Sequence, residues 1–349
     1  MASLLLPIIY LAFISLGLPD ALLGAAWPTM YPQLGAQVSW AGGVSMIISA
    51  CTILSALASD RLNERLGTGR VTAISVAATA AALLGFSFCH AFWQLCLWAI
   101  PYGLGAGSVD AALNNYVALH YKSRHMSWLH CMWGVGASLG PVIMGQALAG
   151  SGWQGGYRII GILQVVLTVV LLFSLPLWKL PQDAMGGEPF TPQHRSFPEL
   201  LKITGVPEVL VCFLCYCALE STAGMWASSY CTLVRGLDAQ TAASWASLFY
   251  LGITAGRFVS GFLTIKMSDR NMIRLGQVLI ALGILLVLLP AGNNVLFVGL
   301  ILIGLGCAPV YPCIIHETPV NFGRELSMSM TGLQMAFAYV GSCLAPPLF

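Results

Sequence analysis

The sequence has 349 residues, of which 58% are hydrophobic and only 8% are charged, and its net charge is +2 at pH 7. A mean hydropathy of +0.81 lies far outside the range of a soluble domain, whose surface must be solvated. The composition therefore excludes a soluble globular protein and indicates that a lipid bilayer surrounds most of the chain. The small net charge gives no indication of a nucleic-acid partner, and none is predicted.

The charged residues fall in clusters separated by apolar runs of roughly 20 residues, the length of helix that crosses about 30 Å of hydrocarbon. The first run, Leu4 to Pro28, lacks a basic N-terminal region and a small-residue cleavage site, so a membrane span is predicted there rather than a signal peptide. Hydropathy predicts eleven spans, at residues 4–28, 38–58, 71–89, 93–118, 126–149, 157–179, 206–231, 241–264, 272–290, 295–315 and 327–349.

A polar stretch from Pro181 to Lys202, rich in glycine and proline, follows the sixth predicted span. It divides the chain into an N-terminal six-helix half at 1–180, a cytoplasmic linker at 181–205 and a C-terminal half at 206–349. The C-terminal half has five predicted spans, whereas a repeat of the first half would have six. The sequence is therefore expected to be either a fragment or a protein that lacks a peripheral twelfth helix.

Features of the first half recur in the second half, in the same order and at an offset of about 200 residues, which indicates an internal repeat. The recurring features are Asp20, Gly24, Trp27 and Tyr31 with Glu220, Gly224, Trp226 and Tyr230; Asp60-Arg61 with Asp269-Arg270; Gly103-Leu104-Gly105 with Gly304-Leu305-Gly306; and His130 before Pro141 with Gln334 before Pro346.

The basic residues are distributed unevenly between the two sides of the predicted membrane. The richer side has Arg61, Arg65, Arg70, Lys122, Arg124, Lys179, Arg195, Lys202, Lys266, Arg270, Arg274 and Arg324. The other side has only Arg158 and Arg235, and Arg257 lies within the eighth span. The positive-inside rule makes the richer side cytoplasmic and places the N-terminus in the cytoplasm.

No metal, cofactor or enzymatic activity is predicted. The chain has eleven cysteines, nearly all within apolar spans, where cysteine acts as a small packing residue. Cys212 and Cys215 lack the polar surroundings of a metal or redox site. The sequence also has no clustered metal ligands, no nucleophile paired with a base and no GxxxxGK[ST] loop, so neither an enzyme nor an ATP-driven pump is expected.

Two charged loops, ASDRLNERLGTGR with Asp60 and GRFVSGFLTIKMSDR with Asp269, resemble the loop signature of the major facilitator superfamily. The first lacks the leading glycine of that signature, and the second matches it better. Two further segments resemble motifs of the fucose permease-like sugar transporters within this superfamily. PDALL, with Asp20, is similar to the first helix of the fucose permeases. GLGAGSVDAALNNYV places Asp110 and Asn114 where these permeases have an acid and an asparagine, with aspartate in place of their usual glutamate.

The resemblance implies an all-α membrane protein with the major facilitator fold, in which two pseudo-symmetric six-helix halves surround a polar path, here with the twelfth helix absent. It also implies a multi-pass protein of the bacterial inner (plasma) membrane that works by alternating access. A monomer is expected.

Three acids lie well inside predicted spans: Asp20, Asp110 and Glu220. A charged carboxylate at the bilayer centre costs about 3 kcal/mol on insertion scales, so such residues usually face a polar interior. All three are candidates for proton coupling, with Asp110 as the main proton acceptor and Asp20 as a second titrating group that orients substrate or holds a gate. The alternative for each acid is a structural bond to the backbone or to a basic partner such as Arg257.

A sugar needs partners that both donate and accept hydrogen bonds, and flat faces for its apolar C–H surfaces. Candidate substrate-binding residues within the spans are Asn114, Asn115, His130, Gln146, Gln334, Trp27, Trp133 and Trp226. His130 could instead be bonded to a backbone carbonyl. Trp27 and Trp226 could instead anchor their helices at the membrane interface.

The charged loops at 60–70 and 266–274 are predicted to act as inner-gate elements, through Asp60, Arg61, Arg65, Asp269 and Arg270, or else to be plain solvated loops. The run from Gly134 to Gly145 resembles a signature of drug–proton antiporters, although close helix packing through small residues is the favoured interpretation.

The leading functional hypothesis is proton symport of a sugar or related small polar solute. The alternatives are a drug or metabolite antiporter of the same superfamily and a transport-inactive sensor. Sodium remains open as the coupling ion, because carboxylates with asparagine and backbone carbonyls can hold either ion. The sequence does not identify the solute.

Overall fold

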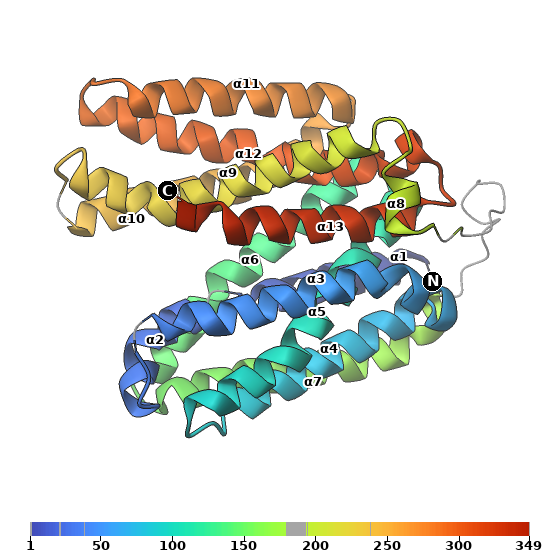
Figure 1. Cartoon of the computed structure of the whole chain (residues 1–349), viewed down its shortest axis with the longest axis horizontal. Coiled ribbons are helices and arrows are strands. Elements are labelled where there is room, and N and C mark those ends of the chain that lie inside the picture. The colour runs from blue at the N-terminus through green and yellow to red at the C-terminus, as the bar shows by residue number, and fades with distance from the viewer. Residues whose placement is uncertain are drawn as a thin grey trace. The chain divides into compact units, whose positions relative to one another are not determined.

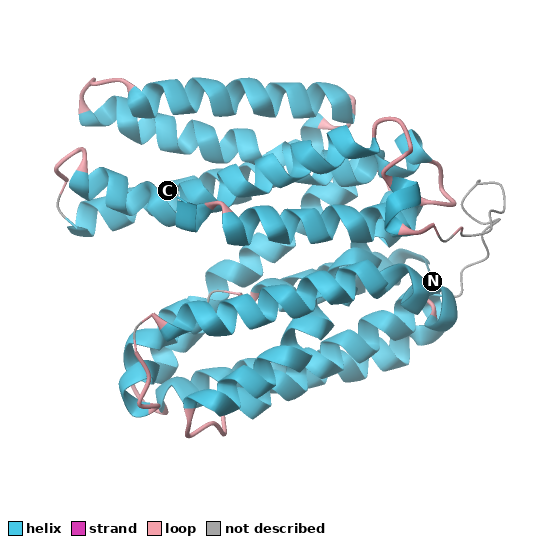
Figure 2. Ribbon diagram, viewed as in Figure 1, coloured by secondary structure: helices cyan, strands magenta, loops and turns pink. Residues whose placement is uncertain are grey.

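The structure is a computed structural model that describes residues 2–20, 22–37, 39–178, 193, 195–237 and 239–348. Within these residues every regular element is a helix, which confirms the all-α prediction (Figures 1 and 2). The α-helices are α1 (Ala2–Gly17), α2 (Leu22–Gln33), α3 (Trp40–Leu66), α4 (Thr68–Phe86), α5 (Phe92–His120), α6 (Ser123–Leu148), α7 (Gly152–Ser174), α8 (Phe197–Leu200), α9 (Val206–Leu233), α10 (Ala239–Leu263), α11 (Asp269–Leu288), α12 (Asn293–Phe322) and α13 (Ser327–Leu344). Two 3-10 helices, η1 (Leu175–Trp178) and η3 (Pro346–Leu348), follow α7 and α13.

Eight stretches of helix in the described part of the chain are long and apolar enough to cross a membrane. They are Leu4–Trp27, Trp40–Leu66, Thr68–Phe86, Ser123–Leu148, Gly152–Trp178, Val206–Ala227, Asp269–Leu288 and Asn293–Phe322. The chain is therefore a multi-pass membrane protein. Helices α5, α10 and α13 occupy three further predicted spans without being among these eight, so the count of eleven spans stays a prediction.

The first predicted span, 4–28, corresponds to the membrane-crossing stretch Leu4–Trp27, and within that stretch a turn separates two helices. Helix α1 ends at Gly17 and α2 begins at Leu22. Pro19 has no N–H to donate and its ring clashes with the preceding helical turn, so the helix breaks there. The Asp20 amide donates to the Gly17 carbonyl at 3.2 Å and the Leu22 amide donates to the Pro19 carbonyl at 3.1 Å. Each bond joins residues only three apart in the sequence, so the two bonds form a turn. Asp20 lies in this turn, between α1 and α2.

Residues 179–192 and 194, which make up most of the predicted linker, lie outside the described residues. The last part of the linker contains α8, which begins with a capping box. The Ser196 amide donates to the Glu199 carboxylate at 2.9 Å, which satisfies an amide that the helix itself leaves without a partner.

Contacts divide the chain into two compact units, which are described separately below. Unit 1 comprises Met1–Tyr116, Met132–Arg195 and Arg324–Ala336, and unit 2 comprises Val117–Cys131, Ser196–Gly323 and Phe337–Phe349. Each unit includes a short segment from the other half of the sequence. The predicted division at 181–205 remains a proposal about the sequence repeat.

The repeated Gly-Leu-Gly motif lies at close helix contacts in both units. In unit 1, Gly103 of α5 lies against the backbone of Ile48 in α3. In unit 2, Gly304 of α12 lies against the backbone of Phe249 in α10, and Gly306 lies against Gly276 in α11. A side chain at any of these glycines would overlap the facing helix, so the motif recurs because both units pack helices through small residues.

The glycine run of α6 also mediates packing in unit 1. A Cβ atom at Gly136 would overlap the Ile14 carbonyl group of α1, whereas a Cβ atom at Gly145 would meet nothing within 4 Å. We expect Gly136→Ala to lower stability by about 1–3 kcal/mol, the usual cost of overpacking. Gly145→Ala, the matched control on the same helix, should be neutral or slightly stabilising. Thermal unfolding of the two variants in detergent measures the difference, and equal midpoints would contradict this packing.

Candidate functional site

Asp20 in unit 1 uses both carboxylate oxygens. Trp133 Nε1 on α6 donates to Oδ2 at 2.7 Å, and the Tyr102 hydroxyl on α5 lies 3.5 Å from Oδ1. The acid lies in the turn between α1 and α2. Three elements far apart in the sequence therefore meet at the carboxyl group, which remains accessible from one side.

That accessible side faces a cavity of about 150 Å³ within unit 1. Its lining combines a carboxylate, hydroxyl groups and aromatic rings: Pro19, Asp20, Leu23, Val44, Ser45, Ile48, Ser49, Leu83, Phe86, Tyr102 and Tyr157. Hydroxyl groups both donate and accept hydrogen bonds, and aromatic faces can cover apolar C–H groups. The cavity therefore has the chemistry of a site for a small polar solute.

Asp110 and Asn114 lie one helical turn apart on α5 and are both buried. The Asn114 side-chain amide donates to Asp110 Oδ1 at 2.8 Å and to the Asp110 backbone carbonyl at 3.0 Å. Asp110 is also close enough to Asp20 for the two carboxyl groups to interact electrostatically. The structure thus brings together two of the three predicted acids and one predicted amide within unit 1.

Glu220, the third predicted acid, forms an ion pair in unit 2 with Arg257 of α10. Arg257 Nη2 lies 3.4 Å from Glu220 Oε1, and the arginine and glutamate side chains are only 4% and 20% exposed. A structural bond to Arg257 is the alternative to proton coupling that the sequence analysis left open for Glu220. His130 lies nearby in the same unit, with its ring centroid 4.7 Å from that of Tyr311.

Aromatic residues that sequence reasoning did not select surround His130 and the ion pair. The Tyr311 ring centroid is 4.7 Å from that of Phe213, and the Tyr216 hydroxyl donates to the Cys307 carbonyl at 2.8 Å. Tyr102 of unit 1 was missed in the same way. The signal available for Tyr102 was its place directly before the repeated Gly-Leu-Gly motif.

Of the predicted tryptophans, Trp133 contacts an acid, whereas the other two lie elsewhere. Trp27 is buried in the hydrophobic cluster of unit 1, with its ring centroid 6.4 Å from that of Phe92. Trp226 of unit 2 is 39% exposed and donates to the Pro346 carbonyl at 2.8 Å. Neither residue lines the unit 1 cavity.

The three remaining predicted amides also lie outside the lining of that cavity. Asn115 Oδ1 accepts a hydrogen bond from the Ser327 hydroxyl at 2.5 Å. Gln334 is fully buried, and Gln146 is exposed on α6. Asn115 therefore contacts the first residue of α13 and does not lie with Asn114 beside the acids.

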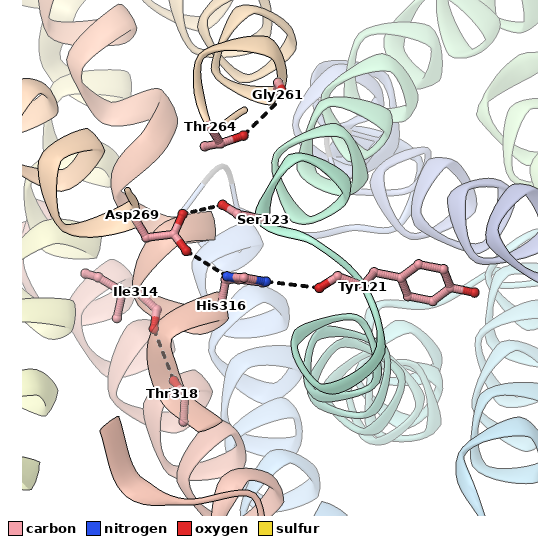
Figure 3. Close-up of polar contacts among 8 residues, drawn as sticks. All are labelled: Tyr121, Ser123, Gly261, Thr264, Asp269, Ile314, His316 and Thr318. Atoms are coloured by element: carbon pink, nitrogen blue, oxygen red, sulfur yellow. Dashed lines mark hydrogen bonds and ion pairs between the residues drawn. The ribbon is translucent and has the colours of Figure 1, made fainter. Parts of the chain in front are cut away.

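The two predicted gate aspartates bind the beginnings of helices. In unit 1, Asp60 Oδ2 accepts from the Ser329 hydroxyl of α13 at 3.0 Å. In unit 2, Asp269 Oδ1 accepts from the hydroxyl of Ser123, the first residue of α6, and Oδ2 lies 2.7 Å from His316 Nδ1 (Figure 3). An acid at a helix N-terminus interacts favourably with the helix dipole.

The three predicted gate arginines, Arg61, Arg65 and Arg270, are exposed. Among the described residues, no group of three or more His, Cys, Asp or Glu side chains is arranged to hold a metal ion.

Three comparisons bear on this geometry. The chain is 26% identical over 375 residues to the probable nitrate/nitrite antiporter NarK1 of Thermus thermophilus, which covers 94% of this chain and 82% of that protein. It is 24% identical to the membrane sensor protein UhpC of Salmonella typhimurium, with coverage of 84% and 71%. The solved structure of the fucose:proton symporter FucP of E. coli superposes with a TM-score of 0.74 at 16% identity, covering 99% of this chain and 90% of that one.

At such low identity the likeness to FucP demonstrates the fold alone. The family model for the Major Facilitator Superfamily matches residues 9–346, which is nearly the whole chain. This match confirms the family suggested by the sequence motifs and indicates a transport protein rather than an enzyme. The chain belongs to the Major Facilitator Superfamily.

Proposed function

We propose that this chain moves a sugar or a related small polar solute across the membrane in symport with protons. The observation that carries the proposal is Asp20, which lies in a helix break and faces a cavity lined by hydroxyl and aromatic groups. Discontinuous helices are a recurrent device for placing solute and ion sites near the bilayer midplane of transporters.

The proton-binding role is assigned to Asp110 and Asp20. A buried carboxylate is costly in its charged form, so binding a proton removes that cost when the site closes around its cargo. The Asn114 side-chain amide donates one bond to the Asp110 carboxyl group and one to the Asp110 backbone carbonyl, which fixes the orientation of the carboxyl group on α5. Trp133 and Tyr102 hold Asp20 in the same way. Glu220 is assigned a structural role, because Arg257 pairs with it.

Alternating access exposes one site to the two sides of the membrane in turn. The bonds from Asp60 to α13 and from Asp269 to α6 each join segments from different halves of the sequence. We assign these bonds to the inner gate, and they would break during each transport cycle.

The experiment that tests the function is uptake into proteoliposomes across a panel of sugars and polyols, with an imposed pH gradient or sodium gradient. The proposal expects accumulation of at least one sugar that depends on the pH gradient and collapses when a protonophore is added. Accumulation of drugs or anions in exchange for protons would reject it in favour of an antiporter. Sugar accumulation that depends on the sodium gradient instead would identify sodium as the coupling ion.

A transport-inactive sensor is the second candidate, because UhpC is a membrane sensor. It predicts that the purified protein binds a solute, measured by ligand-induced thermal stabilisation, while proteoliposomes show neither uptake nor exchange of that solute. Exchange of bound solute across the membrane would exclude this candidate.

We further propose a monomer in the bacterial inner membrane with a cytoplasmic N-terminus. The support for the orientation is the distribution of basic residues, twelve on one predicted side and two on the other. A reporter that is active only in the cytoplasm, inserted after Arg195 and separately after Gly150 in the turn between α6 and α7, should be active at the first position and inactive at the second. The reverse pattern would overturn the orientation.

A further inference from the structure

His316 of α12 has hydrogen-bonding partners on both ring nitrogens. Nδ1 lies 2.7 Å from Oδ2 of Asp269, the first residue of α11 (Figure 3). Nε2 lies 3.0 Å from the backbone carbonyl oxygen of Tyr121, in the turn between α5 and α6. The other oxygen of Asp269 accepts from Ser123, where α6 begins. All four residues belong to unit 2.

These partners determine how many protons the pair must hold. A carbonyl oxygen can only accept, so His316 Nε2 carries a hydrogen and donates it to Tyr121. The bond between Nδ1 and Asp269 also needs a hydrogen, whether it is carried by the imidazole or by the carboxyl group. In both cases His316 and Asp269 together hold one proton more than a neutral imidazole and an ionised carboxylate.

Loss of that proton breaks one of the two bonds. A neutral imidazole has a single N–H group. If the hydrogen stays on Nε2, the lone pair of Nδ1 faces the negative carboxylate of Asp269. If it moves to Nδ1, the lone pair of Nε2 faces the Tyr121 carbonyl oxygen. Deprotonation therefore separates α12 either from α11 or from the turn between α5 and α6.

The surroundings of His316 include a second acid. Glu317 follows it on α12 and interacts electrostatically with both His316 and Asp269. The other titratable and charged groups near this contact are Cys313 on α12, Arg270 on α11, the Tyr121 side chain in the turn, and Lys122, Arg124 and His125 at the start of α6. The ring therefore interacts with carboxyl groups on both α11 and α12.

Unit 1 has a comparable contact, in which Asp60 binds Ser329 of α13 and an amide takes the place of the imidazole. Asn115 precedes His316 by the same offset that separates Gly103 from Gly304, so it is the counterpart in the sequence repeat. Its side chain binds Ser327, the first residue of α13. An amide does not titrate in this pH range, so protonation can control the contact in unit 2 while leaving the contact in unit 1 unchanged.

We propose that His316 and Asp269 form a proton-binding site that joins α12 both to α11 and to the turn between α5 and α6, and that loss of its proton breaks one of these two contacts. The site is separate from Asp20 and Asp110. One consequence rests on the proposed function. If the protein must open this contact during each transport cycle, a low pH on the predicted cytoplasmic side slows solute exchange. The contact itself can be tested without transport.

The test is hydrogen–deuterium exchange of the full chain in nanodiscs between about pH 5.5 and about pH 9, which brackets the ordinary histidine pKa of about 6.5. Labelling times are scaled to the intrinsic pH dependence of amide exchange. Protection of at least one of two peptides, covering 118–126 and 266–272, should fall about tenfold as the pH rises, because one charge-assisted hydrogen bond of His316 is lost. A peptide covering 325–331 should show no such change.

Variants assign the response to the proposed pair. His316→Gln and Asp269→Asn should abolish this pH response. Asn115→Ala, the matched control, should lower protection near α13 and leave the pH response intact. Equal protection of the wild-type peptides at both ends of the pH range would overturn the proposal, and so would a pH response that persists in His316→Gln.

A second measurement covers the case in which the variants fail to fold. Nitrogen-15 NMR of the histidine-labelled wild-type chain should show one histidine with both ring nitrogens protonated, or sharing a proton with a carboxyl group, at a pH where the peptides are protected. That signal should disappear over the pH range in which protection falls. If proteoliposomes show no uptake but hydrogen–deuterium exchange still shows the pH response, the transport proposal is refuted. The proposal of a proton-binding site is then unaffected.

Discussion

Replacing Asp110 with Asn should abolish proton-driven uptake while leaving solute exchange intact. The substitution keeps the shape of the side chain and its ability to bond with Asn114, whose amide group can still meet an oxygen at that position. It removes the group that takes up and releases a proton. A carrier with a permanently neutral site can still exchange bound solute across the membrane, but it has no means of coupling solute movement to a pH gradient.

The measurement is a pair of assays on the same proteoliposomes: accumulation under a pH gradient, and counterflow without one. We expect accumulation in Asp110→Asn to fall to background and counterflow to stay near the wild-type rate. Glu208→Gln, which removes an exposed carboxylate from the first turn of α9, is the control and should change neither. Unchanged pH-dependent accumulation in Asp110→Asn would remove Asp110 from the coupling mechanism.

Replacing Arg257 with Leu should destabilise unit 2 by about 3 kcal/mol, the cost of leaving one partner of a buried ion pair uncompensated. The Glu220 side chain that would be left behind is only 20% exposed, so water compensates only in part for the lost arginine. Removing both charges, in Arg257→Leu with Glu220→Gln, should recover most of the loss, because no uncompensated charge remains. Arg235→Leu, the matched control, removes an arginine whose partners are backbone carbonyls.

Thermal unfolding in detergent measures these effects. The single Arg257 variant should unfold at a clearly lower temperature than both the double variant and the wild type. If the double variant is as unstable as the single one, the arginine acts through packing and not through its charge. If the double variant is stable and also retains proton-driven accumulation, Glu220 has no part in coupling, as its pairing suggests.

The membrane class, the helices, the internal repeat and the family could be predicted from the sequence because each rests on local composition or on spacing along the chain. Asp110 and Asn114 illustrate this. Residues four apart on a helix share a face, and that rule alone places the Asn114 amide on the Asp110 carboxyl group. The repeat of Gly-Leu-Gly likewise followed from spacing along the chain, and the structure adds that the motif lies at close helix contacts in both units.

Contacts between segments that are distant in the sequence could not be predicted from spacing along a helix. Asp20 was selected because an acid in an apolar span is costly, but its partners Tyr102 and Trp133 come from α5 and α6. His316 was missed because the predicted span ended at residue 315, whereas α12 continues to Phe322. Helical periodicity defines which side chains share a face, and only the packing of one helix against another decides which face each of them meets. For that reason the sequence alone determined the class and the candidate acids, and the tertiary structure decided that Glu220 is paired, that Asn115 binds a helix start, and that His316 joins α12 to α11 and to the turn before α6.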